Sequence, residues 1–406
     1  MPEPEKYFHK LPPCPLYDTE GIESWLEDLS REGLTLQEES PFLGFLSFVP
    51  GTPRPVRYRM EPALKSQGFF DSAPNCPPED AIALHEAFGW DFVIRLGEFF
   101  LYRSYDPHAR EINTDPQIQE LTLKQLKKRQ RSALIAEILG ICLHICFGFL
   151  GYPVMLLVSL GTLTSLCLAA LLLIALMNPL FLIIHLEKQC RRLKNGDNLH
   201  RHKQWRSGQL RHYAAKALPV VLFLVFCVGM LSSLIRQEDA VPLADYEGSL
   251  PFVTMGKLIP ESSFTRTSSP WLNELTVWKD PLIPQSFDYS ESGKIVTPDG
   301  QVLDGSLFVK YHETAAPFLA RQLMREFLRY ADKGKYYDGP AVPACDTGSV
   351  TVFTYRGRYG LNTLLMQYGT IVLEANILIY DEADQPLLDL WIQSMVSMLT
   401  EQENSL

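Results

Sequence analysis

The residues whose types and spacing most resemble a catalytic signature are Asp346-Thr347-Gly348, which match the D-T-G run of aspartic proteases. That chemistry needs two carboxylates that share one proton. The sequence contains no second copy of the run, so a protease would have to be a homodimer. The neighbouring residues also fit a simple turn that enters a strand at Val350. Because glycine-rich phosphate loops, H-E-x-x-H and G-x-S-x-G are absent too, we expect no enzymatic activity and no catalytic residues.

Three histidines, His200, His202 and His212, form the cluster that could suggest a metal site. No cysteine or carboxylate lies at ligand spacing to complete such a site. The neighbouring lysines and arginines would also repel a cation. We therefore expect a solvated basic loop here, with no metal and no cofactor.

Three ionisable residues, Glu137, His144 and His185, lie in or beside long apolar runs. Such residues inside a bilayer are costly and often functional. Glu137 and His144 share a helix face, and an antiparallel return of the next helix would bring His185 to the depth of Glu137. A Glu137–His185 pair could respond to protons or to a ligand. Alternatively, both residues lie within about a turn of the interface and stay hydrated, which is the interpretation we favour.

Three apolar runs organise the middle of the chain: Leu134–Leu150, Val154–Ile184 and Ala217–Ile235. A helix needs about 20 apolar residues to span the hydrocarbon core of a bilayer. The second run holds 31 residues without a formal charge, which no soluble core explains. We therefore predict three transmembrane helices within residues 133–236, with a turn at residues 151–153.

Basic residues flank these runs unevenly, both before the first run and in a loop at residues 186–216 after the second. Those expected to contact anionic lipid headgroups are Lys127, Lys128, Arg129, Arg131, Arg191, Arg192 and Lys194. Positive residues stay on the cytoplasmic side of a membrane. We therefore predict a multi-pass protein of the cell membrane with a cytoplasmic amino terminus and an extracytoplasmic carboxyl-terminal part.

The net charge of −10 hides three blocks of different sign. Residues 1–115 carry a net charge of −10, residues 116–236 carry +11, and residues 237–406 carry −11. Attraction to phosphate dominates the affinity of proteins for DNA, so acidic flanking domains argue against nucleic acid as a partner. The basic block instead lies beside the apolar runs, where a lipid surface explains it.

Residues 1–115 show the pattern of a small cytoplasmic α+β domain. An amphipathic helix is expected at residues 18–32, because Ile22, Trp25, Leu26 and Leu29 recur at helical spacing. The other expected elements are strands at 34–37, 43–49, 56–60, 92–96 and 99–103 and a second helix at 79–88. A basic linker helix at residues 116–132 would lead into the membrane.

Four stretches of this domain resemble an uncharacterised bacterial family of unknown function, DUF2812. Residues 25–34 (W-L-E-D-L-S-R-E-G-L) are similar to its W-L-N-E-M-A-x-x-G-W element. Residues 56–59 resemble its Y-R-Y-R strand, and residues 89–93 and 99–102 resemble its G-W-E-Y-V and aromatic hairpin. The resemblance covers roughly residues 17–105.

Two positions depart from the family pattern: Glu27 replaces asparagine and Leu34 replaces tryptophan. The resemblance implies a domain attached to membrane helices in a bacterial protein, often alongside PadR-type transcriptional regulators. It implies no catalytic or ligand-binding residues, because the family has no established activity.

Residues 237–406 are expected to form a second, extracytoplasmic α+β domain. Residues 237–300 are rich in Pro, Ser and Asp and are predicted to be an irregular, packed lead-in. A sheet with helices on one side would follow. Its predicted elements are strands at 307–311, 350–355, 361–367 and 370–380 and helices at 314–332 and 387–399.

A folded domain on each side of a membrane, without catalytic chemistry, favours a non-enzymatic signalling or regulatory protein. The outer domain would bind a ligand or partner, and the helices would couple it to the cytoplasmic domain and a protein partner. A second hypothesis is an accessory subunit of a membrane transporter complex, because small residues in the second apolar run could pack against a partner helix. The aspartic protease remains a third.

Overall fold

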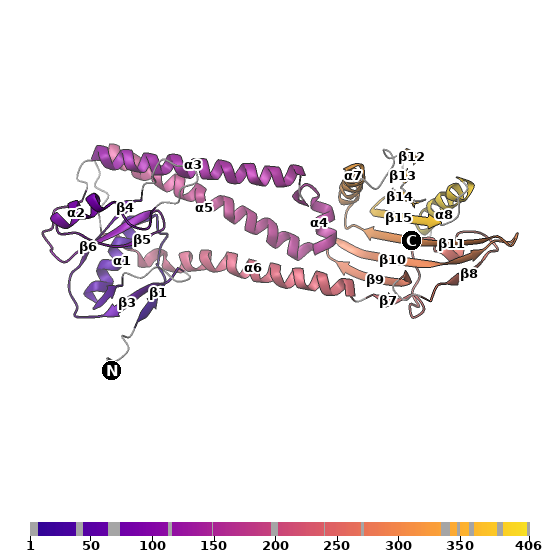
Figure 1. Ribbon diagram of the computed structural model, residues 1–406, viewed down its shortest axis with the longest axis horizontal. Coiled ribbons are helices and arrows are strands. Elements are labelled where there is room, and N and C mark those ends of the chain that lie inside the picture. Colours follow the sequence, from indigo (N-terminus) through magenta and orange to yellow (C-terminus); the bar gives the residue numbers. More distant parts are fainter. Residues whose placement is uncertain are drawn as a thin grey trace. The chain divides into compact units, whose positions relative to one another are not determined.

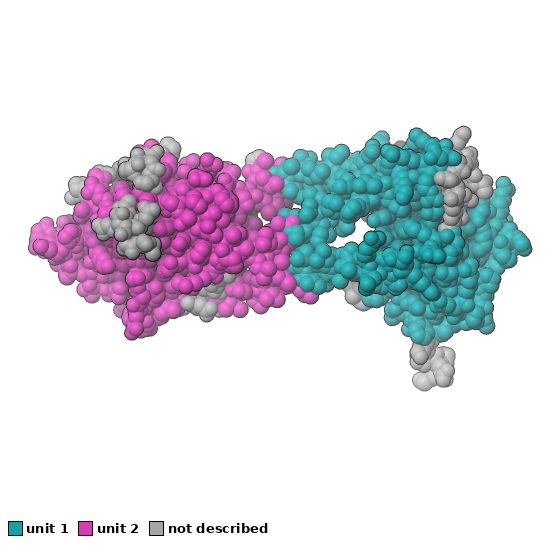
Figure 2. Space-filling view, turned by 180° about the vertical axis from the view of Figure 1, so that it is seen from behind, with its two compact units in different colours: residues 1–142, 170–222 teal, residues 143–169, 223–406 magenta. Residues whose placement is uncertain are grey.

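The computed structural model describes residues 7–37, 44–63, 74–112, 116–147, 149–195, 202–238, 240–268, 272–333, 342–346, 350–356, 361–379 and 385–403. Helices and β-strands occur largely in separate runs along the chain (Figure 1), which confirms the predicted α+β class. The chain forms two compact units (Figure 2). The first comprises residues 1–142 and 170–222, and the second comprises residues 143–169 and 223–406.

The first unit begins with the predicted small α+β domain. It contains two three-stranded antiparallel sheets, ordered β1-β3-β2 and β4-β6-β5. Its elements are β1 (Phe8–Lys10), α1 (Thr19–Arg31), β2 (Leu34–Leu36), β3 (Leu46–Pro50), β4 (Arg57–Pro62), α2 (Glu79–Ala87), β5 (Asp91–Leu96) and β6 (Phe99–Ser104). Asp18 caps α1 by accepting a hydrogen bond from the Gly21 amide at 3.3 Å. Burial of Ile22, Trp25 and Leu26 confirms that α1 is amphipathic.

Helix α1 also completes the edge of the second sheet, because its carboxylates accept hydrogen bonds from backbone amides of β4. Glu23 accepts from the Met60 amide at 2.8 Å, and Glu27 accepts from the Tyr58 amide at 3.4 Å. Strand β4 is the outer strand of its sheet, so these amides would otherwise lack partners. The helix therefore closes an edge that another chain could pair with.

Arg59 on β4 neutralises the same carboxylates. Its guanidinium lies 3.2 Å from Glu27 and 3.7 Å from Glu23, and it donates two hydrogen bonds of 2.8 Å to Glu111. Only 9% of Arg59 is exposed. A buried charge is tolerated when it is paired in this way, so the network joins α1, β4 and the segment that ends the domain.

Among the described residues, only two of the three predicted membrane spans qualify as candidates. Three long helices are present: α3 (Pro116–Phe147), α5 (Thr162–Lys194) and α6 (Gln209–Glu238). Among the described residues, two segments have the length and apolar composition to cross a membrane, Thr162–Lys194 and Arg206–Ile235. The apolar part of α3 covers only residues 133–147, about 22 Å of helix against a hydrocarbon core of about 30 Å.

The second apolar run is also divided, where the sequence predicts one helix. Helix α4 (Pro153–Leu160) ends at Gly161, whose φ of 85° favours glycine, and α5 begins at the next residue. The Thr162 amide donates to Asp280 at 2.9 Å, a distant contact that no local pattern reveals. The predicted loop at 186–216 is largely helical, because α5 continues through its first turns and α6 begins before its end.

The second unit is built on a nine-stranded antiparallel sheet. The strand order is β12-β13-β14-β15-β11-β10-β9-β7, and β8 pairs with β10. Its strands are β7 (Val241–Pro242), β8 (Ser263–Arg266), β9 (Glu274–Asp280), β10 (Ile283–Val296), β11 (Val302–Glu313), β12 (Val342–Asp346), β13 (Val350–Arg356), β14 (Leu361–Tyr368) and β15 (Ile371–Ile379). The accompanying helices are α7 (Pro317–Lys333) and α8 (Gln385–Glu403).

Helices cover both faces of this sheet, which corrects the prediction that they lie on one side. Leu364 and Met366 pack into the core that contains Trp391 of α8. Leu365, between them, points to the opposite face and packs with Leu323 of α7. Helix α4 joins α7 on that second face, where both contribute to the same hydrophobic cluster.

Residues 237–300 are not the irregular lead-in that the sequence predicts, because β7, β8, β9 and β10 lie within them. The alternation of apolar residues in β10 is interrupted at Glu291, which is only 1% exposed. This carboxylate accepts hydrogen bonds from Arg266 at 3.0 Å and from the Met255 amide at 2.8 Å. Because this buried charge interrupts the apolar pattern, hydrophobicity alone does not predict the full strand.

Candidate functional site

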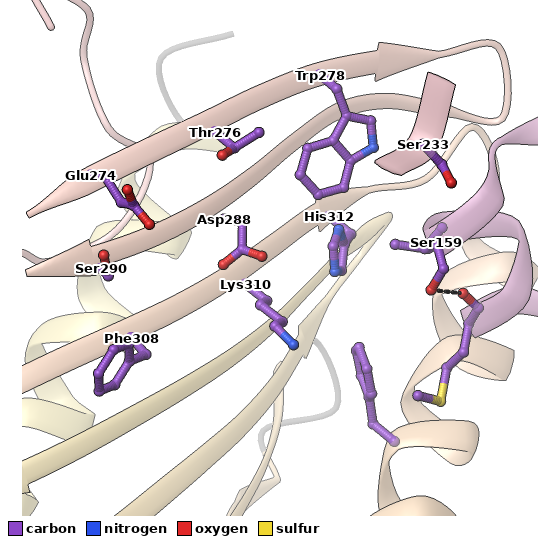
Figure 3. Close-up of a pocket in the computed structure, with 13 residues that line it drawn as sticks. Ser159, Ser233, Glu274, Thr276, Trp278, Asp288, Ser290, Phe308, Lys310 and His312 are labelled. Atoms are coloured by element: carbon purple, nitrogen blue, oxygen red, sulfur yellow. Dashed lines mark hydrogen bonds between the residues drawn. The ribbon is translucent and has the colours of Figure 1, made fainter. Parts of the chain in front are cut away.

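A cavity of about 510 Å³ lies in the second unit, on the sheet face that α4 and α7 share (Figure 3). Three neighbouring strands form its floor, and three helices contribute to its walls. The floor residues are Glu274, Thr276 and Trp278 of β9, Asp288 and Ser290 of β10, and Phe308, Lys310 and His312 of β11. The wall residues are Met155, Val158 and Ser159 of α4, Ser233 of α6 and Phe327 of α7.

Alternation along the strands explains why these side chains reach the cavity. Phe287 and Tyr289 on β10 pack into the main core, so Asp288 between them points to the other face. Val309 and Tyr311 do the same on β11, and Lys310 between them points to the cavity. The floor is therefore the polar face of strands whose apolar face builds the core.

The strand registers arrange the floor in rows of directly opposed residues. In the central row, Thr276 of β9 faces Asp288 of β10, which faces Lys310 of β11, which faces Glu374 of β15. Side chains directly opposite each other lie about 5 Å apart at Cβ. Lys310 thus stands between two acidic residues that the sequence separates widely.

A second row, beside the first, brings Glu274, Ser290 and Phe308 together. The hydroxyl oxygen of Ser290 is buried and has no hydrogen-bond partner among the described residues. Buried polar atoms are nearly always paired, so an unpaired one calls for an explanation. Ser290 itself lines the cavity, beside Glu274.

The charges in the cavity are unusual because they are not paired. Asp288 and Lys310 are exposed to it, and among the described residues neither forms an ion pair within 4.0 Å. Desolvation raises the pKa of the Asp288 carboxyl, although the nearby Lys310 opposes this shift. Desolvation likewise raises the pKa of Glu374. At both acidic groups of the central row, desolvation thus outweighs the attraction of Lys310.

His312, in the remaining row, is a structural residue. Its Nδ1 lies 2.6 Å from the Ser286 hydroxyl, and its ring stacks on Phe327 with centroids 6.2 Å apart. Burial, aided by Lys310, lowers its pKa to about 3, so the imidazole is neutral. Ser286 is completely buried and is not among the residues that line the cavity.

The predicted intramembrane residues do not form a site among the described residues. Glu137 and His144 lie on α3, and Glu137 has no hydrogen bond or ion pair in the described part of the chain. His185 on α5 instead packs against Tyr17, with ring centroids 5.1 Å apart. The Nε2 atom of His185 is buried without a hydrogen-bond partner there. The predicted pair of Glu137 with His185 is therefore not formed in the part of the chain that the structure describes.

Most of the predicted lipid-facing basic residues have protein partners. Arg192 makes two contacts with Glu20, at 2.8 and 3.0 Å. The other pairs are Lys127 with Glu187 at 2.7 Å, Arg129 with Glu98 at 2.8 Å, Arg191 with Glu187 at 3.4 Å and Lys194 with Glu120 at 3.7 Å. Lys128 and Arg131 are exposed and form no ion pair among the described residues. Contact with anionic lipid stays a prediction, and these two side chains are the most available for it.

The acidic face of α1 binds the segment between α5 and α6. Lys203 contacts Asp18 at 2.5 Å, and its backbone amide donates to the Ser24 hydroxyl at 2.9 Å. Asp28 accepts a hydrogen bond of 3.0 Å from the Trp205 indole. Burial would raise the pKa of Asp28, but bonds from Trp205 and His202 outweigh it and lower that pKa. The domain thus binds this segment through several polar and charged contacts.

The other candidates from the sequence lie largely outside the described residues. No group of three or more His, Cys, Asp and Glu side chains that could hold a metal ion occurs in the described part of the chain. His200 lies outside it, whereas His202 is 3.3 Å from Asp28. Asp346 ends β12, but Thr347 and Gly348 are outside the described residues. The metal-free and non-enzymatic expectations therefore stay predictions.

Sequence reasoning missed the cavity altogether. Asp288 falls in the predicted irregular lead-in, and Lys310 falls in a predicted strand without an assigned role. The available signal was the alternation Phe287-Asp288-Tyr289-Ser290, which is typical of a strand with one buried face. Only the pairing of β10 with β11 then brings the two charges together.

Comparison with known proteins identifies the amino-terminal part of the chain. Residues 18–135 match the family described as "Protein of unknown function (DUF2812)". This confirms the resemblance, and the matched segment extends into α3. No curated protein and no solved structure matches the chain. The cavity lies outside the matched segment, so its role has to be inferred from geometry.

Proposed function

We propose that this chain is a non-enzymatic membrane protein of signalling or regulation, whose carboxyl-terminal sheet binds a small ligand. The amino-terminal domain would pass the bound state to a protein partner in the cytoplasm or membrane. The observation that carries the proposal is the cavity whose floor holds Asp288 and Lys310, both without ion-pair partners among the described residues. Cavities of about 300–1,000 Å³ with a few convergent polar groups are typical ligand sites.

The helices support a membrane location with defined sides. Helix α5 begins at the Thr162–Asp280 contact and ends at the Arg192–Glu20 contact. If α5 and α6 cross a membrane, α1 lies on the same side as residues 202–208, because it contacts them directly. The basic charge of that segment favours the cytoplasm for this side, and the proposal then puts the nine-stranded sheet outside the cytoplasm. This topology requires another crossing between residues 112 and 162, where α3 lies.

The same helices supply a route for coupling. Ser233 of α6 lines the cavity, while Tyr213 of α6 donates a hydrogen bond of 2.8 Å to the Leu11 carbonyl in the amino-terminal domain. A ligand that moves one end of a continuous helix shifts contacts at its other end. In this proposal, ligand binding changes the contacts between α1 and residues 202–208, and a partner responds to that change.

A screen for stabilising ligands tests the proposal. The full chain in detergent is heated with panels of small amines, carboxylic acids, sugars and nucleosides while its melting temperature is recorded. At least one class should raise the melting temperature of the wild type. The double variant Asp288→Asn with Lys310→Met should lose the response. The variant Asp304→Asn, on the same sheet but outside the cavity, should keep it.

Two outcomes of this screen would contradict the proposal. One is that no class of compound raises the melting temperature of the wild type. The other is that the double variant responds as the wild type does, which would place any binding elsewhere in the chain.

An accessory subunit of a membrane complex is the second candidate function. The observation that favours it is the exposed apolar surface of α6, where Leu224, Val228 and Leu231 are 58%, 68% and 59% exposed. Lipid covers such a surface as readily as a partner helix does. Purification in mild detergent separates the two, because an accessory subunit brings a stoichiometric partner with it and an independent receptor does not.

A further inference from the structure

We infer that the cavity takes a small organic cation, an amine whose ammonium group lies between Glu274 and Asp288 and whose hydrocarbon part contacts Trp278 and Phe308. The inference rests on the proposed ligand-binding role and names the chemical class of the ligand.

The balance of charge in the cavity selects a cation. The floor supplies the carboxylates of Glu274 and Asp288, with Glu374 following in the central row, against the ammonium of Lys310. His312 contributes no charge, because it is buried and neutral. The walls from α4, α6 and α7 add only apolar side chains and hydroxyls among the described lining residues. Among the lining residues, two carboxylates therefore face one ammonium, so one negative charge is left over and an anion would have to overcome it.

The position of Lys310 leaves the two lining carboxylates free for a ligand. Lys310 is directly opposite Asp288 on one side and Glu374 on the other, so its charge is shared between them. Glu274 lies on the far side of Asp288, two residues along β9 from the residue opposite it. Such diagonal neighbours lie about 7–8 Å apart, a gap in which one ammonium group can donate to both carboxylates.

Ser290 lies beside both carboxylates, and its hydroxyl has no hydrogen-bond partner among the described residues. Ser290 is directly opposite Glu274 and two residues along β10 from Asp288. Its oxygen is buried without a hydrogen-bond partner among the described residues. An ammonium group carries several donors, so a group held by the two carboxylates has a further hydrogen for this oxygen.

Aromatic rings flank the acidic group. Figure 3 shows Asp288 and Lys310 toward the middle of the cavity, with Trp278 and Phe308 on either side. Trp278 is half-buried, and Phe308 is 38% exposed to the cavity. Aromatic faces attract cations and also cover hydrocarbon. These rings therefore favour an organic amine over a hydrated metal ion.

Calorimetry with matched probes tests the class of ligand. The full chain in detergent is titrated with butylamine, putrescine, butyrate and butanol, which share a four-carbon chain and differ in charge. The amines should bind, whereas butyrate and butanol should not. Asp288→Asn and Glu274→Gln should each weaken amine binding about tenfold or more, as expected for a lost charge-assisted hydrogen bond. The control Asp304→Asn, outside the cavity on β11, should bind as the wild type does.

The variant Lys310→Met distinguishes a positively charged ligand from a negatively charged one. It removes the positive charge that the described floor residues supply, so amine binding should be retained or strengthened, whereas an anion would lose its partner. Binding of butyrate that Lys310→Met abolishes would overturn the inference and leave the proposed ligand-binding role standing. Failure of every probe here, and of every class in the thermal screen, would overturn both. Melting curves of the unliganded variants show that each one is folded.

Discussion

At the scale of single residues, the chain treats its charged side chains in two ways. Arg59 and Glu291 are almost fully buried, and each is held by several partners of opposite charge or by backbone amides. Asp288 and Lys310 are left without ion pairs among the described residues, in a shared cavity. Paired buried charges serve the fold, whereas unpaired charges cost free energy that a ligand can recover. This contrast distinguishes the candidate site from the structural networks.

The raised pKa of Asp288 predicts a pH dependence of stability. The fold favours the protonated carboxyl, so its destabilising effect is absent below the usual value of 3.8 and develops as pH rises through the raised pKa. Asp288→Asn removes this effect. Near neutral pH, the unliganded variant should therefore melt at the same temperature as the wild type or higher, and the difference should shrink near pH 4. A variant that melts well below the wild type at neutral pH would show that the carboxylate is a structural partner.

For Arg59, which is paired, we expect the opposite effect of substitution: a loss of stability. Arg59→Met leaves Glu23, Glu27 and Glu111 without their common partner, which should lower the free energy of unfolding by about 3–5 kcal/mol. Arg31, whose side chain is 54% exposed in a surface pair with Asp28, serves as the control. Arg31→Met should change stability by about 0.5 kcal/mol or less. Denaturant titration followed by circular dichroism measures both, and equal effects would refute the structural role of Arg59.

At the scale of elements, the crossing of α5 and α6 depends on one glycine. A Cβ atom at Gly229 of α6 would overlap the side chain of Thr164 on α5, so the two helices approach closely only because no side chain is present. Small residues permit such approaches between apolar helices. Thr164, one of the small residues in the second apolar run that could have packed against a partner helix, therefore packs within the chain.

Gly229→Ala should accordingly destabilise the protein in detergent, although alanine is the better helix former by about 1 kcal/mol. A methyl group added at Gly140 of α3 would meet no neighbouring atom within 4 Å in the described part of the chain, so Gly140→Ala should be neutral or stabilising. Thermal unfolding of the two variants beside the wild type gives the comparison. If Gly229→Ala is as stable as Gly140→Ala, the close crossing is absent.

The elements also show where sequence patterns suffice. Helix α1 was predictable, because Asp18 caps it and Ile22, Trp25, Leu26 and Leu29 mark its buried face. The break at Gly161 and the buried Glu291 of β10 were not, since they depend on the distant partners Asp280 and Arg266. The candidate site was hidden for the same reason: its residues become neighbours only through antiparallel pairing of strands that local hydrophobicity did not mark.

At the scale of the whole molecule, the proposed topology predicts that the two ends of the chain lie on opposite sides of the membrane. A green fluorescent protein fused before Met1 should fluoresce, and alkaline phosphatase fused after Leu406 should be active, because that enzyme folds in oxidising compartments outside the cytoplasm. Ser207→Cys, in the segment that α1 grips, should react with an impermeant thiol reagent only after cells are opened. An inactive phosphatase fusion would place both ends on one side and contradict the proposed topology.

Hydrogen–deuterium exchange tests the coupling of ligand to the amino-terminal domain most directly. Peptides that cover α1 and residues 202–208 are followed in the full chain, with and without a saturating amine from the calorimetric series. We expect a changed exchange rate in these peptides for the wild type and none for Asp288→Asn at the same amine concentration. An amine that binds the cavity by calorimetry but leaves the exchange of these peptides unchanged would contradict the proposed coupling.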